Sequence, residues 1–162
     1  MSCLLLISCS ATKSYKSELI PAIDRYQGTI YKIIKKARRE GYWPQDTDVF
    51  IVSAKYGLIS EHTLIESYDL KMTRVRAVEL QVEVSHALDE LLRERLYDKI
   101  FINMGKVYSL SIGLSQEIEY ARQGGILQEA FGGIGERQHQ TKVWLKVQYN
   151  LGLKALEDNS SI

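Results

Sequence analysis

The 162-residue chain has little cysteine, little proline and almost no net charge. Cys3 and Cys9 lie on or just after an apolar stretch. In an extended strand they are roughly 20 Å apart, too far for a disulfide. Two free thiols are typical of a reducing compartment, so we expect a cytoplasmic protein. The formal net charge of +1 argues against broad, nonspecific wrapping of nucleic acid but leaves room for a local basic site.

Long hydrophobic runs, repeats and low-complexity tracts are also missing. The N-terminal apolar run, Cys3 to Ile7, is short and has no basic segment before it, so it is neither a signal peptide nor a membrane span. We therefore expect no membrane partner. The length favours one domain, which we place at residues 1–156, with residues 157–162 as a flexible tail.

Signatures of metals and of nucleoside triphosphates are absent as well. His62, His86 and His139 have no ligand-like spacing, and the cysteines are too few, so we predict no metal. The chain has no Gly-x-x-x-x-Gly-Lys-Ser/Thr pattern, which argues against triphosphate hydrolysis. We expect no cofactor.

What is present is an alternation of strand and helix patterns. Apolar runs predict buried strands, and three- and four-residue apolar steps predict helices between them. This order favours a three-layer α/β/α fold with a mainly parallel four-stranded sheet. The expected strands are Cys3–Ile7, Val49–Ser53, Lys99–Asn103 and Ile126–Phe131, and the expected helices are Pro21–Glu40, Arg74–Leu96, Lys106–Ala121 and Glu136–Leu156.

Some boundaries and one core stripe can be named. Gly41 should end the first helix, and Thr73 is a plausible N-cap of the second. We read residues 60–72 as a loop. The apolar stripe predicted to face the core in the second helix is Val75, Val78, Val82, Leu88, Leu91 and Leu92.

Four loops should meet at one edge of this sheet, because ligands of such folds bind beyond the carboxyl ends of the strands. All four are rich in Gly, Ser, Tyr or Lys, and they are Ser8–Ser17, Ala54–Leu58, Asn103–Tyr108 and Phe131–Arg137. Their agreement predicts one ligand site, to which Gly105 and Tyr108 of the third loop would belong.

The first loop carries Ser8, Ser10, Lys13 and Tyr15. Hydroxyls, backbone amides and an ammonium at a strand end suit an anion or a hydrogen-bonded base. Lys13 would also be a nucleophile if it were desolvated. A polar turn capped by serines is the alternative.

The second loop and the irregular segment after it supply further candidates. Tyr56 can stack on a planar ring and Lys55 can meet a phosphate, although a simple turn explains both equally well. Glu66 leads the acids of the irregular segment and could orient a water or bind sugar hydroxyls, with Tyr68 beside it.

The fourth loop is a glycine-rich turn into a predicted helix N-terminus. Gly135 and Arg137 could receive a phosphate there, and tight packing of the turn is the alternative. Separately, a basic cluster on the first helix is either a solvated face or a nucleic-acid contact. It comprises Lys35, Lys36, Arg38 and Arg39.

Three motifs in order resemble a family of bacterial and phage proteins known mainly as a domain of unknown function. They are Ser8-Cys9-Ser10-Ala11-Thr12-Lys13, Ser53-Ala54-Lys55-Tyr56-Gly57-Leu58 and Glu66-Ser67-Tyr68-Asp69-Leu70, followed by Gly133-Ile134-Gly135-Glu136-Arg137. Residues 9–17 also resemble an archaeosine synthase loop from the domain that handles a deazaguanine base in tRNA. The arrangement is similar to the uracil-DNA glycosylase superfamily, which has a ligand loop after its first strand.

The resemblance departs from a glycosylase in one respect. A glycosylase loop carries an Asp or Asn that positions water, and residues 8–17 contain neither. If the chemistry is glycosidic hydrolysis, Glu66 or Asp69 must supply the base, or Lys13 must attack directly.

Together these features predict a domain that recognises a nucleobase, a nucleotide or nucleic acid, and that acts on the base or its N-glycosidic bond with Lys13 and Glu66 as catalytic residues. One alternative is a noncatalytic module that binds nucleotide or nucleic acid. Another is a stress-response protein that binds DNA through the basic cluster. The oligomeric state is left open.

Overall fold

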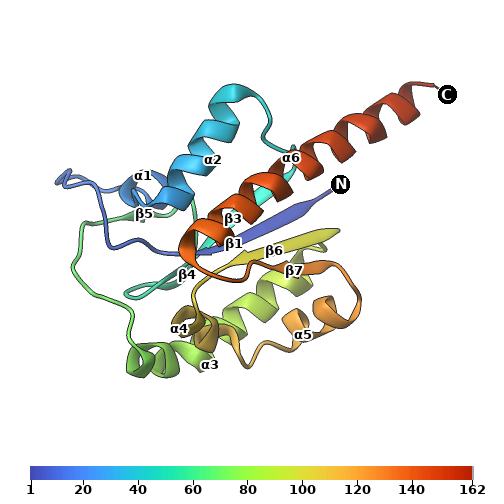
Figure 1. Cartoon of the computed structure of the whole chain (residues 1–162). Helices are drawn as coiled ribbons and strands as arrows, with labels where there is room; N and C mark the ends of the chain where they lie inside the picture. Colours follow the sequence, from blue (N-terminus) through green and yellow to red (C-terminus); the bar gives the residue numbers. More distant parts are fainter. Residues whose placement is uncertain (162) are drawn as a thin grey trace.

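The computed structural model describes residues 1–161, and within them a mixed five-stranded sheet forms the centre (Figure 1). Its order is β4-β3-β1-β6-β7. The strands are β1 (Cys3–Ser8), β3 (Thr47–Ser53), β4 (Gly57–Ser60), β6 (Lys99–Asn103) and β7 (Leu127–Glu129). Neighbours among β3, β1, β6 and β7 pair in parallel, whereas β4 is antiparallel to β3.

The α/β class is therefore confirmed, but the prediction of a four-stranded sheet is wrong. The extra strand β4 follows β3 after a three-residue turn and folds back along it, with Ser53 opposite Gly57. Gly57 has a φ of +72°, a backbone conformation that glycine adopts without strain, and it closes this turn. A four-residue antiparallel edge strand has no strong pattern of its own, which is why the sequence hid it.

Helices cover both faces of the sheet. One face carries α1 (Ala22–Arg25), α2 (Thr29–Glu40) and α6 (Ile134–Ser160) (Figure 1). The other carries α3 (Arg74–Glu94), α4 (Lys106–Ser109), the 3-10 turn η1 (Leu110–Ile112) and α5 (Gln116–Gln123). A small two-stranded ladder joins β2 (Ile20–Pro21) to β5 (Leu64–Ile65) beside α1.

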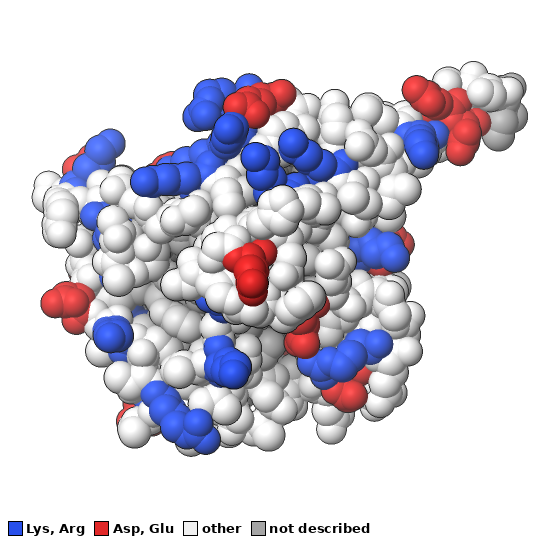
Figure 2. Space-filling model, viewed as in Figure 1, with Lys and Arg blue, Asp and Glu red and all other residues white. Residues whose placement is uncertain are grey.

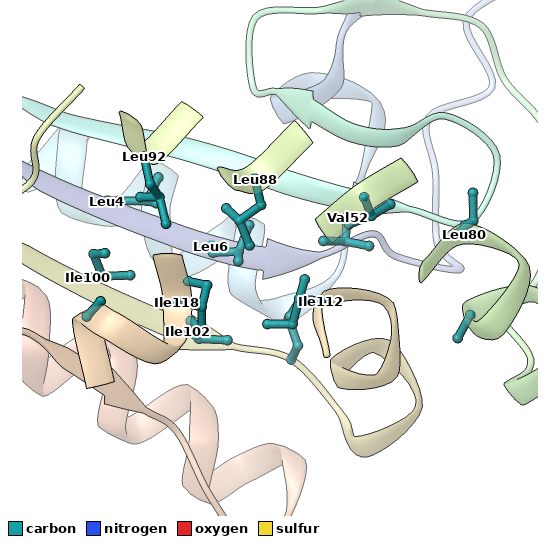
Figure 3. Close-up of a cluster of buried hydrophobic side chains, with 14 of the residues drawn as sticks. Leu4, Leu6, Val52, Leu80, Leu88, Leu92, Ile100, Ile102, Ile112 and Ile118 are labelled. Carbon is teal, nitrogen blue, oxygen red and sulfur yellow. The ribbon is translucent and has the colours of Figure 1, made fainter. Parts of the chain in front are cut away.

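The side chains of β1 alternate between two cores, as the period of a strand requires. Leu4 and Leu6 point toward α3 and α5, where they meet Leu88 and Leu92 (Figure 3). Cys3, Leu5 and Ile7 point into the opposite core with α1, α2 and α6. The continuous apolar run of β1 thus reflects burial on both faces, typical of a central parallel strand.

Two predicted helices are interrupted. The first is split into α1 and α2 by Tyr26, Gln27 and Gly28, and a Cβ added to Gly28 would lie 2.6 Å from Ser10 Oγ. Gly28 therefore lets the start of α2 approach the first loop closely. Gly41, with a φ of +80°, ends α2 as predicted. The helix expected from Lys106 to Ala121 is divided among α4, η1 and α5.

The predicted core stripe of α3 is partly wrong. Val75, Val78 and Val82 are exposed, whereas the buried face carries Ala77, Leu80, Val84, Ser85, Leu88, Asp89 and Leu92. A periodicity reading favours large apolar residues, but a small alanine fits where a helix approaches a sheet. The predicted N-cap is confirmed, because Thr73 Oγ1 accepts a hydrogen bond from the backbone N–H of Arg76 at 3.1 Å.

Helix α6 is longer than predicted and extends past the edge of the sheet (Figure 1). It includes residues 157–160, which we had assigned to a tail, and Ile162 lies outside the described residues. No helix in residues 1–161 combines the length and the apolar character needed to cross a membrane.

Candidate functional site

The strand order creates a topological switch point between β1 and β6. The chain leaves β1 toward β3 on one side, and leaves β6 toward β7 on the other. Because these strands are parallel, all four predicted loops lie at the same carboxyl edge. A crevice at such a point is the usual ligand position in doubly wound sheets.

Cys9 and Tyr108 meet across this switch point. Cys9 follows β1 and Tyr108 belongs to α4 after β6, and the Tyr108 hydroxyl lies 3.1 Å from Cys9 Sγ. Cys9 packs against both cores, so it lies at the end of the sheet between the layers. Burial raises the pKa of Tyr108 well above its ordinary value, which keeps the phenol protonated. Sequence reasoning placed Tyr108 at the site but gave Cys9 no role.

A network of hydroxyl groups lies beside this contact. Tyr26 OH donates to Ser53 Oγ at 3.1 Å and lies 2.6 Å from Tyr68 OH, which is also 3.0 Å from Ser53 Oγ. Tyr31 OH donates to the carbonyl of Ser8 at 2.8 Å. Burial raises the pKa of Tyr26 to about 12. We call Tyr26, Tyr31, Tyr56, Tyr68 and Tyr108 the tyrosine cluster.

Two lysines lie over the tyrosine cluster. Lys13 Nζ is 4.5 Å from the ring centroid of Tyr68, and Lys55 Nζ is 5.3 Å from that of Tyr56. Both distances fall within the range of cation–π attraction. The lysines come from the loops after β1 and β3, so the predicted convergence of these two loops is observed.

Glu66 is paired with Lys55 in an exposed ion pair. The hydrogen bond and charge of Lys55 hold the pKa of Glu66 below its usual range. Glu66 is therefore ionised at neutral pH, which suits a group that stabilises positive charge or orients water. It does not suit a general acid, for which the pKa would have to be raised.

Arg25 organises the first loop, and sequence reasoning missed it. Its guanidinium is fully buried and donates to four backbone carbonyls, those of Ser14, Lys16, Glu18 and Ile65, at 2.7 to 3.1 Å. These contacts fix the path of the loop that carries Lys13. The available signal was an arginine beside the apolar positions of a predicted helix, which is unusual for a solvated charge.

A second region of the same edge contains a cavity of about 480 Å³ beyond the ends of β6 and β7. Lys106, Arg122 and Arg137 line it with Glu129, Ser109 and Phe131, over an apolar floor that includes Ile102, Met104 and Ile112. Arg122 is paired with Glu129 at 2.9 Å, so the acid of the lining is compensated. Lys106 and Arg137 then give the cavity its positive charge, and we call it the basic cavity.

Arg137 is held in the first turn of α6. Gly132 has a φ of +87°, and a Cβ there would lie 1.7 Å from Glu136 Oε2. The same oxygen accepts the backbone N–H of Gly133 at 3.0 Å. In the part of the chain that the structure describes, Arg137 Nε is buried and has no hydrogen-bond partner. Its Nη1 is 3.4 Å from where a Cβ on Gly105 would stand.

The structure thus divides the predicted site residues between two regions. Lys13, Lys55, Tyr56, Glu66 and Tyr68 meet around the tyrosine cluster, Gly105 and Arg137 meet at the basic cavity, and Tyr108 comes from the helix α4 that borders both.

Four predicted residues take a different place. The ring of Tyr15 is 93% exposed. Ser8 offers its carbonyl to Tyr31, and Ser10 lies against Gly28. A Cβ on Gly135 would meet nothing within 4 Å, so no close packing explains this glycine. Across residues 1–161, no three His, Cys, Asp or Glu side chains are grouped so as to hold a metal ion.

Comparison with known families adds one finding. A family of unknown function, DUF6884, matches residues 4–142. The chain belongs to this family. The DUF6884 match runs from β1 into α6 and so includes all four loops of the carboxyl edge. No curated protein and no solved structure matches the chain. The expected membership of a family of unknown function is confirmed, and the likeness to archaeosine synthase and to uracil-DNA glycosylases stays a prediction.

Proposed function

We propose that this DUF6884 protein recognises a nucleotide at the carboxyl edge of its sheet, with the phosphate in the basic cavity. The observation that carries the proposal is the lining of the basic cavity, where Lys106 and Arg137 lie over an apolar floor and Glu129 is already paired with Arg122. A phosphate between these two cations would gain charge-assisted hydrogen bonds.

The position of Arg137 supports an anion. The N-terminus of a helix carries a partial positive charge, which Glu136 offsets in part, while Arg137 adds a positive charge to the same first turn of α6. An anion bound there would offset both the dipole and the guanidinium charge. A planar guanidinium can also contact two phosphate oxygens at once, which favours phosphate over a spherical anion.

The other walls of the cavity suit a base. Phe131 is 75% exposed at its rim and offers a ring for stacking. The floor is apolar, and a volume of about 480 Å³ is ordinary for a small-molecule site. Inorganic phosphate alone would leave this apolar surface uncovered, so a phosphate joined to a planar group is the better fit.

We further propose that the protein catalyses a reaction on the base or its N-glycosidic bond. An ionised Glu66 could stabilise a cationic sugar, and Lys13 could stabilise negative charge on a departing base. A noncatalytic binding module would keep the cavity without this chemistry. A Lys13→Ala variant that binds nucleotide normally but loses turnover would exclude the binding module.

The binding proposal can be tested by calorimetric titration with AMP, GMP and UMP, each beside its nucleoside and inorganic phosphate. The nucleotides should bind best. Arg137→Gln should weaken nucleotide binding at least about tenfold, the range of one charge-assisted hydrogen bond. Arg74→Gln, a change of an exposed arginine at the start of α3, is the matched control and should change nothing.

Two results would contradict the proposal. Equal affinity for a nucleotide and its nucleoside would show that the phosphate does not contribute to binding. Equal affinity of the Arg137→Gln variant and the unchanged protein would place the ligand outside the basic cavity.

A further inference from the structure

The near-zero net charge of the chain conceals a strong segregation of charge. α2 and residues 137–156 of α6 together contain nine Lys or Arg and one acid, Glu40. The rest of the chain therefore has twelve basic and nineteen acidic residues out of the totals of 21 and 20. Figure 2 shows the consequence: Lys and Arg side chains gather over α2 and the adjoining part of α6, along the top of that view.

On α2, the basic residues differ in how firmly they are held. Arg38 makes two hydrogen bonds of 2.7 Å to the buried carboxylate of Glu61 and so has a structural role. Lys35 pairs with Asp24 at 3.3 Å and Lys36 with Glu40 at 3.7 Å, both on the surface. Exposed pairs of this kind contribute little stability and exchange readily for another anion. The basic cluster predicted from sequence thus loses Arg38.

α6 adds basic residues that sequence reasoning did not associate with α2. Lys146 Nζ lies 5.3 Å from the ring centroid of Tyr42, which directly follows α2, and Lys142 is one turn earlier on α6. We define the α2–α6 surface by residues from these two helices. They are Lys32, Lys35, Lys36, Arg39, Lys142 and Lys146.

Aromatic rings and a groove accompany these charges. Tyr42 and Trp43 are partly exposed at the end of α2, next to Lys146 and Arg38 respectively. Basic side chains interleaved with aromatic rings are the pattern that binds unpaired bases by stacking. A groove of about 310 Å³ also starts at the tyrosine cluster and reaches Lys32 and Lys35.

We propose that the α2–α6 surface binds the sugar–phosphate backbone of single-stranded nucleic acid. A duplex would offer phosphates but no exposed base faces for the rings. An anionic membrane would call for large apolar side chains between the lysines, whereas the exposed positions of α2 are Thr29, Lys32, Lys36, Arg39 and Glu40. On α6, the exposed Val143 and Val147 line a separate cavity with Gln128 and His139. This site is separate from the basic cavity, and the inference goes beyond nucleotide recognition there.

The test is fluorescence anisotropy with labelled 12-residue oligo(dT) and oligo(U), over a range of salt concentrations. Binding should weaken with salt, with a slope of about −0.7 per phosphate contact on a single strand. Lys32→Gln with Lys146→Gln should reduce that slope by about 1.4 and weaken binding roughly tenfold or more at 0.1 M salt. Arg74→Gln with Lys99→Gln, two charges on other elements, is the matched control.

The two oligonucleotides report whether DNA or RNA is preferred, and binding of either with the expected slope change supports the proposal. Tighter binding of a 12-base-pair duplex, or of vesicles containing phosphatidylserine, would overturn it. So would an equal loss of affinity in the control pair. Arg137→Gln separates the two sites, because it should weaken mononucleotide binding at least about tenfold while changing the salt slope of oligonucleotide binding by no more than about one phosphate contact.

Discussion

The two halves of the carboxyl edge contain similar polar residues but differ in how many of these residues are paired within the protein. Around β1 and β3 most polar groups are paired. The two terminal nitrogens of Arg25 donate to four carbonyls, although its Nε has no partner within residues 1–161, and the hydroxyls of Tyr26, Ser53 and Tyr68 are linked. Beyond β6 and β7, the buried Nε of Arg137 likewise has no partner in residues 1–161, but this side chain lines the basic cavity. An edge rich in polar residues therefore does not offer the same contacts along its whole length, because polar groups already paired inside the protein have less to offer a ligand.

The largest loss of stability should follow from Arg25→Met, which tests whether the half of the edge around β1 and β3 depends on this buried guanidinium. Loss of a buried charged donor with four acceptors should reduce the free energy of unfolding by about 4 kcal/mol. Urea unfolding would measure it, with Arg74→Met as an exposed control. If the variant is destabilised by less than the control, the loop that carries Lys13 does not depend on Arg25. Nucleotide affinity of the folded fraction should be nearly unchanged.

Gly132→Ala should cause the next largest loss of stability, in the half of the carboxyl edge beyond β6 and β7. A side chain at a φ of +87°, placed 1.7 Å from Glu136 Oε2, forces the start of α6 to shift. We expect a loss of about 2 kcal/mol together with weaker nucleotide binding, because Arg137 moves with that turn. Unfolding and calorimetric titration measure the two effects.

Gly135→Ala is the matched control for this change. Its Cβ would meet nothing within 4 Å and its position is helical, so the variant should be slightly more stable, by about 0.5–1 kcal/mol. Nucleotide binding that fails in Gly135→Ala as well would show that the ligand contacts this glycine directly, as the sequence first suggested.

Tyr26→Phe should cost less, about 1 kcal/mol for the lost hydrogen bonds. It should also alter the response to alkaline pH. The pKa of Tyr26 is raised from 10 to about 12, so its contribution is fully present below pH 10 and is lost as the pH rises toward 12. Unfolding at pH 9 to 11.5 should show a shallower loss of stability in Tyr26→Phe, and an unchanged slope would contradict the burial of this phenol.

Glu66→Gln should have the smallest effect on stability, with no measurable change in the urea midpoint, because both partners of the Lys55–Glu66 pair are exposed. If the protein is an enzyme that uses this carboxylate, turnover should fall while stability and nucleotide affinity stay constant. A drop in stability would instead identify Glu66 as a structural residue of the first half.

The sequence predicted the parts of the fold that rest on burial. Cys3–Ile7 and Lys99–Asn103 were recognised because central parallel strands are apolar throughout, and their order predicted the common edge. The strand β4 and the outward-facing Val75, Val78 and Val82 were missed because a short edge strand and the facing of a helix depend on tertiary contacts.

The spatial grouping of the candidate residues was predicted in outline for the same reason. Loops could be assigned to an edge from the strand order, which brought Lys13 near Tyr68 and Arg137 near Gly105. The role of Arg25 and the position of Cys9 against Tyr108 could not be foreseen, since both depend on contacts between segments far apart in the chain.

The length of α6 sets a fixed distance between the basic cavity and the α2–α6 surface. One continuous helix carries both Arg137, at the basic cavity, and Lys146, on the α2–α6 surface. At about 1.5 Å per residue they stand about 14 Å apart along a single stiff axis. If both proposed sites bind one strand, the strand must bridge that span. Below a threshold length an oligonucleotide would then occupy only one of them, and above it the second contact would become intramolecular.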